Sequence, residues 1–313
     1  MRAASRILLT LLVWTLAPVA FSTQPKSAER PLADAHVHLS AGSPSDLERL
    51  FYQGVVVGRD CGGELAQLRQ WRDEISAGKR RGPHIFFCGP LLDGPKPDAS
   101  WRRVVSTPHE GEEAVEALAR EGVDFIKMHN AVPPEVFLAV IERAGQRGLK
   151  VAAHLPKGVP AWTAAEAGVG SIEHAAESLA ASPIYAGYVE DAAAALDWWF
   201  SPAGDEAIQR LAKSGVTIVP TLVRYEASIT TPDDPDVRAA RAALLPKLLQ
   251  LIGRLHRAGI PLLVGSDLVG LADDVRPEMG PNREIELLVQ AGLTQEEALA
   301  AAAPETLRRW FGK

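Results

Sequence analysis

The sequence predicts an α/β fold built on a parallel sheet, in the form of a (β/α)₈ TIM barrel. Short apolar runs rich in β-branched residues recur along the chain, and amphipathic helical stretches separate them. Near-continuous apolar strands covered by helices are typical of parallel sheets. Several helical stretches end in a glycine just before the next run, the usual signal for a helix C-terminus. These three observations indicate repeated strand–helix units.

The first strand-like run is Asp34–His38, inside PLADAHVHLSAG. The later runs are residues 54–58, 84–87, 124–128, 150–154, 169–174, 216–220 and 260–265. The clearest helical stretches between them are residues 112–120, 134–147, 205–213 and 239–257, and the terminating glycines are Gly122, Gly148, Gly215 and Gly259. A final helical region over 283–288 and 294–309 is expected to close the ring.

Eight such units fit a barrel whose usual size is roughly 250 residues. The alternative is an open, doubly wound sheet. No glycine-rich turn follows the first strand to hold a nucleotide phosphate, so the barrel is favoured.

The composition excludes several classes of protein. With 313 residues, 47% apolar and 23% charged, the chain can bury a large core. A net charge of −6 with interleaved signs provides no basic face, which argues against nucleic acid as a partner. Two cysteines, Cys61 and Cys88, exclude a disulfide-rich scaffold and a cysteine zinc cluster. One disulfide between them is an alternative to two separate buried thiols, and the thiols are favoured.

The N-terminus has the pattern of an export signal. Arg2 and Arg6 precede an almost wholly apolar run over residues 7–19, and small residues follow at the cleavage-determining positions. The alternative is a membrane anchor, but the run is short for spanning a bilayer. We therefore expect a signal peptide over residues 1–22, a linker over 23–30 and the barrel over 31–313. The mature protein is expected to be periplasmic or secreted, with no stable membrane anchor.

Six residues of metal-ligand type fall at or near the ends of the predicted strands. Residues two apart on a strand point to the same face, so the first two would lie side by side. Barrel enzymes place their chemistry at the C-terminal ends of the strands, and imidazole and carboxylate groups bind divalent metals there. The six are His36, His38, Lys127, His154, His174 and Asp267.

These residues lie within words that resemble the amidohydrolase superfamily, in its imidazolonepropionase-like and zinc-dependent prolidase-like branch. The words are DAHVHL, GVVVGRDCGG, GVDFIKMHN, KVAAHLPKG, SIEHA, SGVTIVPTL, PLLVGSD and NREIELLVQAGLTQEEAL, in family order from residue 33 to about residue 300. The resemblance implies a TIM barrel of the metal-dependent hydrolase type.

The resemblance also implies a role for each of the six residues. His36 and His38, with Asp267, resemble the ligands of the more buried metal, and His154 and His174 those of the second. Lys127 resembles the lysine that CO₂ carbamylates so that it bridges two divalent ions, zinc being favoured. Asp267 is then the general base for a hydroxide that bridges the metals.

Three further residues are candidates for substrate contact. His129 follows Lys127 by two positions, and Arg224 and Tyr225 follow the seventh strand, where related dipeptidases hold the substrate carbonyl and carboxylate.

The expected function is hydrolysis of a C–N amide bond in a small-molecule substrate: a dipeptide, an N-acyl amino acid or a cyclic amide. The alternatives are an ester, lactone or phosphotriester hydrolase with the same site, and a non-catalytic barrel that acts as a binding protein. The chain also resembles a family barrel without the usual β-sandwich, and the barrel surface thereby exposed predicts a homodimer.

Overall fold

The computed structural model describes residues 30–95, 101–230, 234–269 and 280–312. The predicted signal peptide, and all of the predicted linker except Arg30, lie outside these residues. Among the described residues, no helix combines the length and the apolar character needed to cross a membrane.

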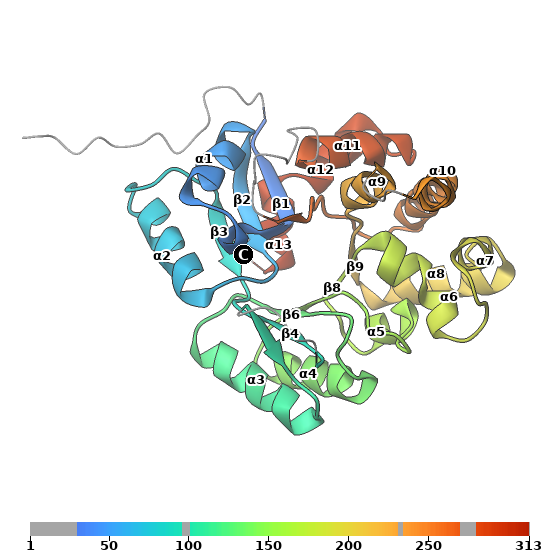
Figure 1. Ribbon diagram of the computed structural model, residues 1–313, viewed down its shortest axis with the longest axis horizontal. Coiled ribbons are helices and arrows are strands. Elements are labelled where there is room, and N and C mark those ends of the chain that lie inside the picture. Colours follow the sequence, from blue (N-terminus) through green and yellow to red (C-terminus); the bar gives the residue numbers. More distant parts are fainter. Residues whose placement is uncertain (1–29, 96–100, 231–233, 270–279, 313) are drawn as a thin grey trace, which may run out of the picture.

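The fold is of the mixed α/β class, and every strand pairing is parallel. A four-stranded sheet has the order β10 (Leu268–Val269), β1 (Leu32–His38), β2 (Val55–Asp60), β3 (His84–Phe87). A six-stranded sheet has the order β5 (Arg102–Val104), β4 (Leu91–Asp93), β6 (Ile126–Met128), β7 (Val151–Ala153), β8 (Ser171–Glu173), β9 (Thr217–Val219). The strands lie centrally and the helices lie around them (Figure 1).

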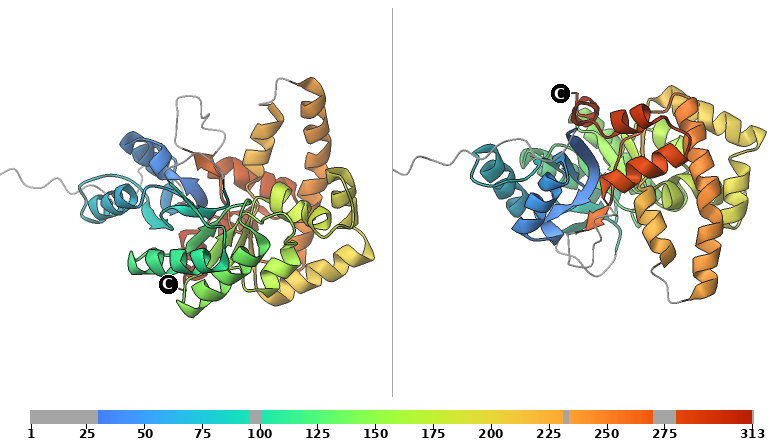
Figure 2. Two further views of the ribbon diagram at one scale, coloured as in Figure 1. Left: turned by 60° about the horizontal axis from the view of Figure 1, so that its bottom comes forward. Right: turned by 90° about the horizontal axis from the view of Figure 1, so that it is seen from above.

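Helices separate most of the strands, and several of them end at the glycines that the sequence predicts. They are η1 (Leu39–Ala41), α1 (Pro44–Tyr52), α2 (Leu65–Ser76), α3 (Pro108–Arg120), α4 (Pro134–Gln146), α5 (Ala161–Glu166), η2 (Ala175–Ala180), α6 (Ser182–Tyr185), α7 (Ala192–Trp198), α8 (Pro202–Ser214), α9 (Leu222–Thr230), α10 (Pro235–Arg257), α11 (Pro281–Gln290), α12 (Gln295–Ala301) and α13 (Pro304–Trp310). The glycines predicted to end helices adopt φ between 68° and 83°, the left-handed region in which glycine is favoured. In the views of Figures 1 and 2, α9 and α10 lie side by side.

Two parts of the chain differ from the sequence prediction. The predicted strand over 260–265 forms one bridge, Ile218 with Leu262, and the assigned strand β10 lies three residues further on. Two residues beyond this run, and directly before β10, Asp267 adopts φ 55°. The segment after β3, where the sequence predicts no strand before residue 124, contains the short strands β4 and β5; β5 carries two arginines and lacks an apolar pattern.

Single backbone hydrogen bonds connect the two sheets. Ala35 N donates to Val264 O at 2.8 Å, and Ile218 N donates to Pro261 O at 2.9 Å, so segment 260–264 lies between β1 and β9. Next to β6, Asp124 N donates to Phe87 O of β3 at 2.9 Å.

A buried apolar cluster lies among side chains from both sheets and from α13. It includes Cys61 and Cys88, which are free thiols rather than a disulfide, as well as Phe125 and Trp310.

Candidate metal centre

The first strand places His36 and His38 next to each other. All seven residues of β1 are buried, and the two imidazole centroids lie 5.4 Å apart. Each ring directs its Nε2 towards the same oxygen, Asp267 Oδ1, at 3.4 Å. The structure therefore brings these two histidines together with Asp267.

The other two histidines complete a row of rings. His154 directly follows β7 and His174 directly follows β8. The ring of His174 lies 4.7 Å from that of His36 and 4.6 Å from that of His154. All four histidines therefore lie in one buried cluster, although they come from three strands far apart in the sequence.

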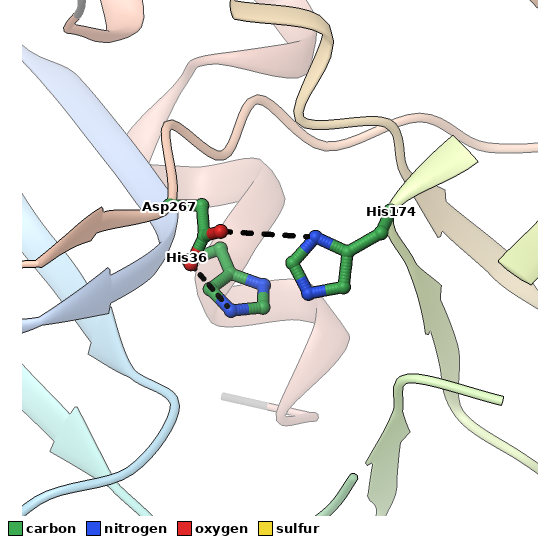
Figure 3. Close-up of side chains that lie close together, drawn as sticks. All are labelled: His36, His174 and Asp267. Carbon is green, nitrogen blue, oxygen red and sulfur yellow. Dashed lines mark ion pairs between the residues drawn. The ribbon is translucent and has the colours of Figure 1, made fainter. Parts of the chain in front are cut away.

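Figure 3 shows how three of these side chains converge. The ligand atoms of His36, His174 and Asp267 all lie within 4.8 Å of one another. The dashed lines mark the 3.4 Å approach of His36 to Asp267 and the 3.9 Å approach of His174 Nδ1 to Asp267 Oδ2. One ion could contact all three groups after small side-chain movements.

Two buried nitrogen atoms in this cluster lack a hydrogen-bond partner. They are His36 Nε2 and His154 Nε2. Buried polar atoms are normally paired, so an unpaired atom in a native structure points to a missing partner such as an ion or water. A divalent cation would satisfy both, and this agrees with the donor set of the site.

The electrostatics favour neutral histidines, the form that binds metal. Burial, with the nearby charge of Lys127, lowers the pKa of His154 to about 2. Burial also lowers the pKa values of His36 and His174. His38 is the exception: burial opposes its charge, but the hydrogen bond and charge of Asp267, the charge of Asp60 and the hydrogen bond to Gly62 O together raise its pKa.

Asp267 is held as a carboxylate. Burial alone would raise its pKa, but the hydrogen bond from His38 and the surrounding imidazoles lower it well below its ordinary value. Its position is fixed from both sides: Asp267 N donates to His36 O at 2.8 Å, and the preceding Ser266 is bonded to Asp34 through N at 3.0 Å and Oγ at 2.5 Å.

Lys127 extends from β6 into the same cluster. Its side chain is buried, and Nζ donates to Met128 O at 3.0 Å. Among the described residues, Lys127 makes no ion pair with a carboxylate.

Backbone strain is concentrated at this site. In the described part of the chain, the non-glycine residues with positive φ are His174, Thr221 and Asp267, at 62°, 49° and 55°. Two of these are candidate ligands. The third, Thr221, lies with its hydroxyl oxygen 3.0 Å from His174 Nδ1.

The predicted substrate residues lie at the rim of the cluster. The ring of His129 is 5.0 Å from that of His154, and its Nδ1 is 3.2 Å from Asp93. Arg224 Nε lies 3.6 Å from Asp267 Oδ2, with the side chain more than half exposed. The hydroxyl group of Tyr225 donates to Arg241 O of α10 at 3.0 Å.

Several residues at the site were not predicted from the sequence. Glu173 lies 2.7 Å from His36 and is paired with the buried Arg59, and the ring of Trp101 lies 5.5 Å from that of His38. Arg59 and Glu173 stand in the words GRDCGG and SIEHA, and Glu173 directly precedes the predicted ligand His174. Their mutual contact spans more than a hundred residues, and nothing in the local pattern indicates it.

Several solved structures are similar to this chain over most of its length. A bottromycin amidohydrolase is 25% identical, with a TM-score of 0.69 over 90% of this chain and 67% of its own. A Xaa-Pro dipeptidase with methionine bound in its active site is 21% identical, with a TM-score of 0.66 over 91% of this chain and 76% of its own. An ochratoxinase from A. niger is 18% identical, with a TM-score of 0.66 over 89% and 71%. No family model matches the chain, and no curated protein matches it.

The predicted resemblance to the amidohydrolase superfamily is therefore confirmed. The neighbours are amidohydrolases and prolidases, which supports an enzyme that acts on C–N bonds.

Proposed function

We propose that this protein is a metal-dependent hydrolase of a C–N amide bond in a dipeptide, an N-acyl amino acid or a cyclic amide. The observation that carries the proposal is the convergence of His36, His174 and Asp267 with two unpaired buried imidazole nitrogens. The amidohydrolase and prolidase neighbours support the same bond type.

The residues fit two divalent ions, of which zinc is the favoured identity. His36, His38 and Asp267 would hold one ion, and His154 and His174 the other. Lys127 would bridge them after its neutral amine adds to CO₂ and loses a proton, because the carbamate is anionic and replaces a buried cation. Bound metals of this kind lower the pKa of a coordinated water and polarise a carbonyl.

The side chains of the protein supply the remaining steps. Asp267 accepts the proton of the attacking water and returns it to the leaving nitrogen, since its carboxylate is ionised at neutral pH. The exposed guanidinium of Arg224, at the rim, binds a substrate carboxylate. His129 contacts the substrate on the side of His154.

An apolar recess beside the rim supports a substrate with an apolar group. It has a volume of about 230 Å³, and Tyr225 is part of its wall. Alanine and leucine side chains from η2, α7 and α10 supply most of the remaining wall. Ala181→Phe would fill this recess, so we expect KM to rise for substrates with a leucine-sized group and to change little for glycine-containing ones.

We also propose that the two sheets form one closed (β/α)₈ barrel. The hydrogen bonds from Ala35 to Val264, from Ile218 to Pro261 and from Asp124 to Phe87 support closure, because each connects neighbouring members of such a ring. The carboxyl ends of the strands would then surround the metal centre, as in other barrel enzymes.

The decisive test is the metal content of the mature protein, purified with bicarbonate and without chelator. We expect close to two divalent ions per chain, and turnover in a screen of dipeptides, N-acyl amino acids and lactones. The exposed His109→Asn variant is the matched control and should keep both ions, whereas His174→Asn should lose metal.

Other outcomes would contradict parts of the proposal. One ion per chain would remove the bridging role of Lys127. Turnover of lactones or esters without amides would change the bond class. No metal after reconstitution would favour the non-catalytic binding protein.

A further inference from the structure

A buried ion pair lies directly behind His36. Arg59 of β2 and Glu173 of β8 are fully buried, and Arg59 Nη2 lies 2.8 and 2.9 Å from the two carboxylate oxygens. Arg59 Nε also donates to Ala35 O of β1 at 2.5 Å. This arginine therefore connects the four-stranded sheet to the six-stranded sheet at the level of the site.

The surroundings leave the Glu173 carboxylate little freedom to turn. Ser171 Oγ donates to Glu173 Oε1 at 2.5 Å, and Arg59 Nη1 donates to Ser171 Oγ at 3.0 Å. The guanidinium carbon of Arg59 lies 4.6 Å from the ring centroid of Trp310, on the side away from the site. The pair is thus packed on one side and hydrogen bonded on the other.

The remaining contact of Glu173 is with His36. Glu173 Oε2 lies 2.7 Å from His36 Nδ1. An ionised carboxylate can only accept hydrogen bonds, so a neutral His36 must carry its proton on Nδ1. The lone pair is then on Nε2, which is the unpaired nitrogen that faces Asp267.

A different use of these residues fits less well. The ligand atoms of His36, Cys61 and Glu173 also lie within 4.8 Å of one another, which allows a second cation site. The guanidinium of Arg59 already forms an ion pair with the Glu173 carboxylate. Burial raises the pKa of the Cys61 thiol well above its usual range. A cation there would be repelled by the arginine and would lack a thiolate ligand.

We propose that Glu173, held in place by Arg59, is a positioning residue that fixes the tautomer of His36 and so strengthens divalent-metal binding at Nε2. A carboxylate or carbonyl on the far nitrogen of a metal-binding histidine commonly has this effect, and its loss costs roughly 10–100-fold in affinity. The effect on affinity rests on the proposed metal-dependent function, whereas the tautomer does not.

The first measurement is the His36 tautomer in the metal-free wild-type protein, by ¹⁵N NMR of the imidazole nitrogens. We expect hydrogen on Nδ1. The second is the affinity for zinc alone, by competition with a chelator, in wild type, Glu173→Gln and Asp124→Asn. The last variant is a matched control, because Asp124 is also a carboxylate paired with an arginine: it lies 2.9 Å from Arg72, whose guanidinium lies over the ring of Phe87.

Glu173→Gln should weaken zinc binding roughly 10–100-fold and change the His36 nitrogen shifts. Asp124→Asn should keep the zinc affinity within twofold of wild type and leave the His36 nitrogen shifts unchanged. Hydrogen on Nε2 of His36 in the wild type would overturn the proposal, even if Glu173→Gln did not fold. Unchanged zinc affinity in a folded Glu173→Gln variant would overturn it as well. If wild type bound no zinc but Glu173→Gln still changed the tautomer, the metal-dependent function would fail and the positioning role would stand.

Discussion

The buried carboxyl group of Glu284 on α11 predicts a stability that falls as pH rises. Its oxygens accept hydrogen bonds from Leu222 N at 3.0 Å and Val223 N at 2.7 Å, in the first turn of α9. Burial nevertheless raises its pKa from 4.5 to about 8, with Asp34 and Glu226 adding negative charge nearby. Between these values the folded protein keeps a proton that the unfolded chain has lost.

The sign follows from that difference in bound protons. The stabilising contribution is complete below pH 4.5, falls between pH 4.5 and 8, and is gone above pH 8. At about 1.4 kcal/mol for each pH unit, the free energy of unfolding should fall by roughly 4 kcal/mol between pH 5 and pH 8 through this group alone.

The assay is urea unfolding of wild type and Glu284→Gln at intervals from pH 5 to pH 8. The glutamine cannot accept both backbone hydrogen bonds, so the variant should start about 1–2 kcal/mol less stable at pH 5. The difference between the two proteins should then shrink and reverse as pH rises.

Glu166→Gln serves as a control for this assay. Hydrogen bonds from Arg210 lower the pKa of the exposed Glu166 below its ordinary value of 4.5. Its titration lies below pH 5 in both states, so the slope between pH 5 and 8 should match that of wild type. Equal slopes in wild type and Glu284→Gln would refute the reasoning about Glu284.

Three further predictions concern the site. Lys127→Ala should lower kcat by more than the roughly 10–100-fold that is typical of losing a residue hydrogen bonded to a metal ligand. A short added carboxylic acid should restore part of the activity. Full turnover with two bound ions would contradict the carbamate. Zinc at about a hundred times its Kd should raise the free energy of unfolding by about 2.7 kcal/mol, measured as a higher urea midpoint, and an unchanged midpoint would argue against a folded-state site. Gly265→Ala should destabilise by about 1–3 kcal/mol, because its Cβ would lie 2.5 Å from Val219 Cγ1 and 2.8 Å from His36 Cβ; wild-type stability would show that this contact relaxes freely.

Much of this architecture could be predicted because its signals are local. A glycine such as Gly215 shows where a helix ends, and apolar runs such as residues 216–220 show where a buried strand lies. The candidate ligands were identified from local signals too, since each lies within a predicted strand or at most two residues past its end. The pairs Arg59–Glu173 and Asp34–Ser266 could not, because they join residues more than a hundred positions apart and depend on how the strands are arranged.

His174 and Asp267 adopt a backbone conformation that their residue types disfavour. A non-glycine residue with positive φ costs on the order of 1–3 kcal/mol, and the surrounding structure must hold it. Here it is held: His174 N donates to Val219 O at 3.0 Å, and Asp267 N donates to His36 O at 2.8 Å. A fold under no constraint but stability would place glycine or asparagine at these turns. Histidine and aspartate stand there instead, with their side chains directed at a common point, and this is the arrangement that the proposed metal site would require.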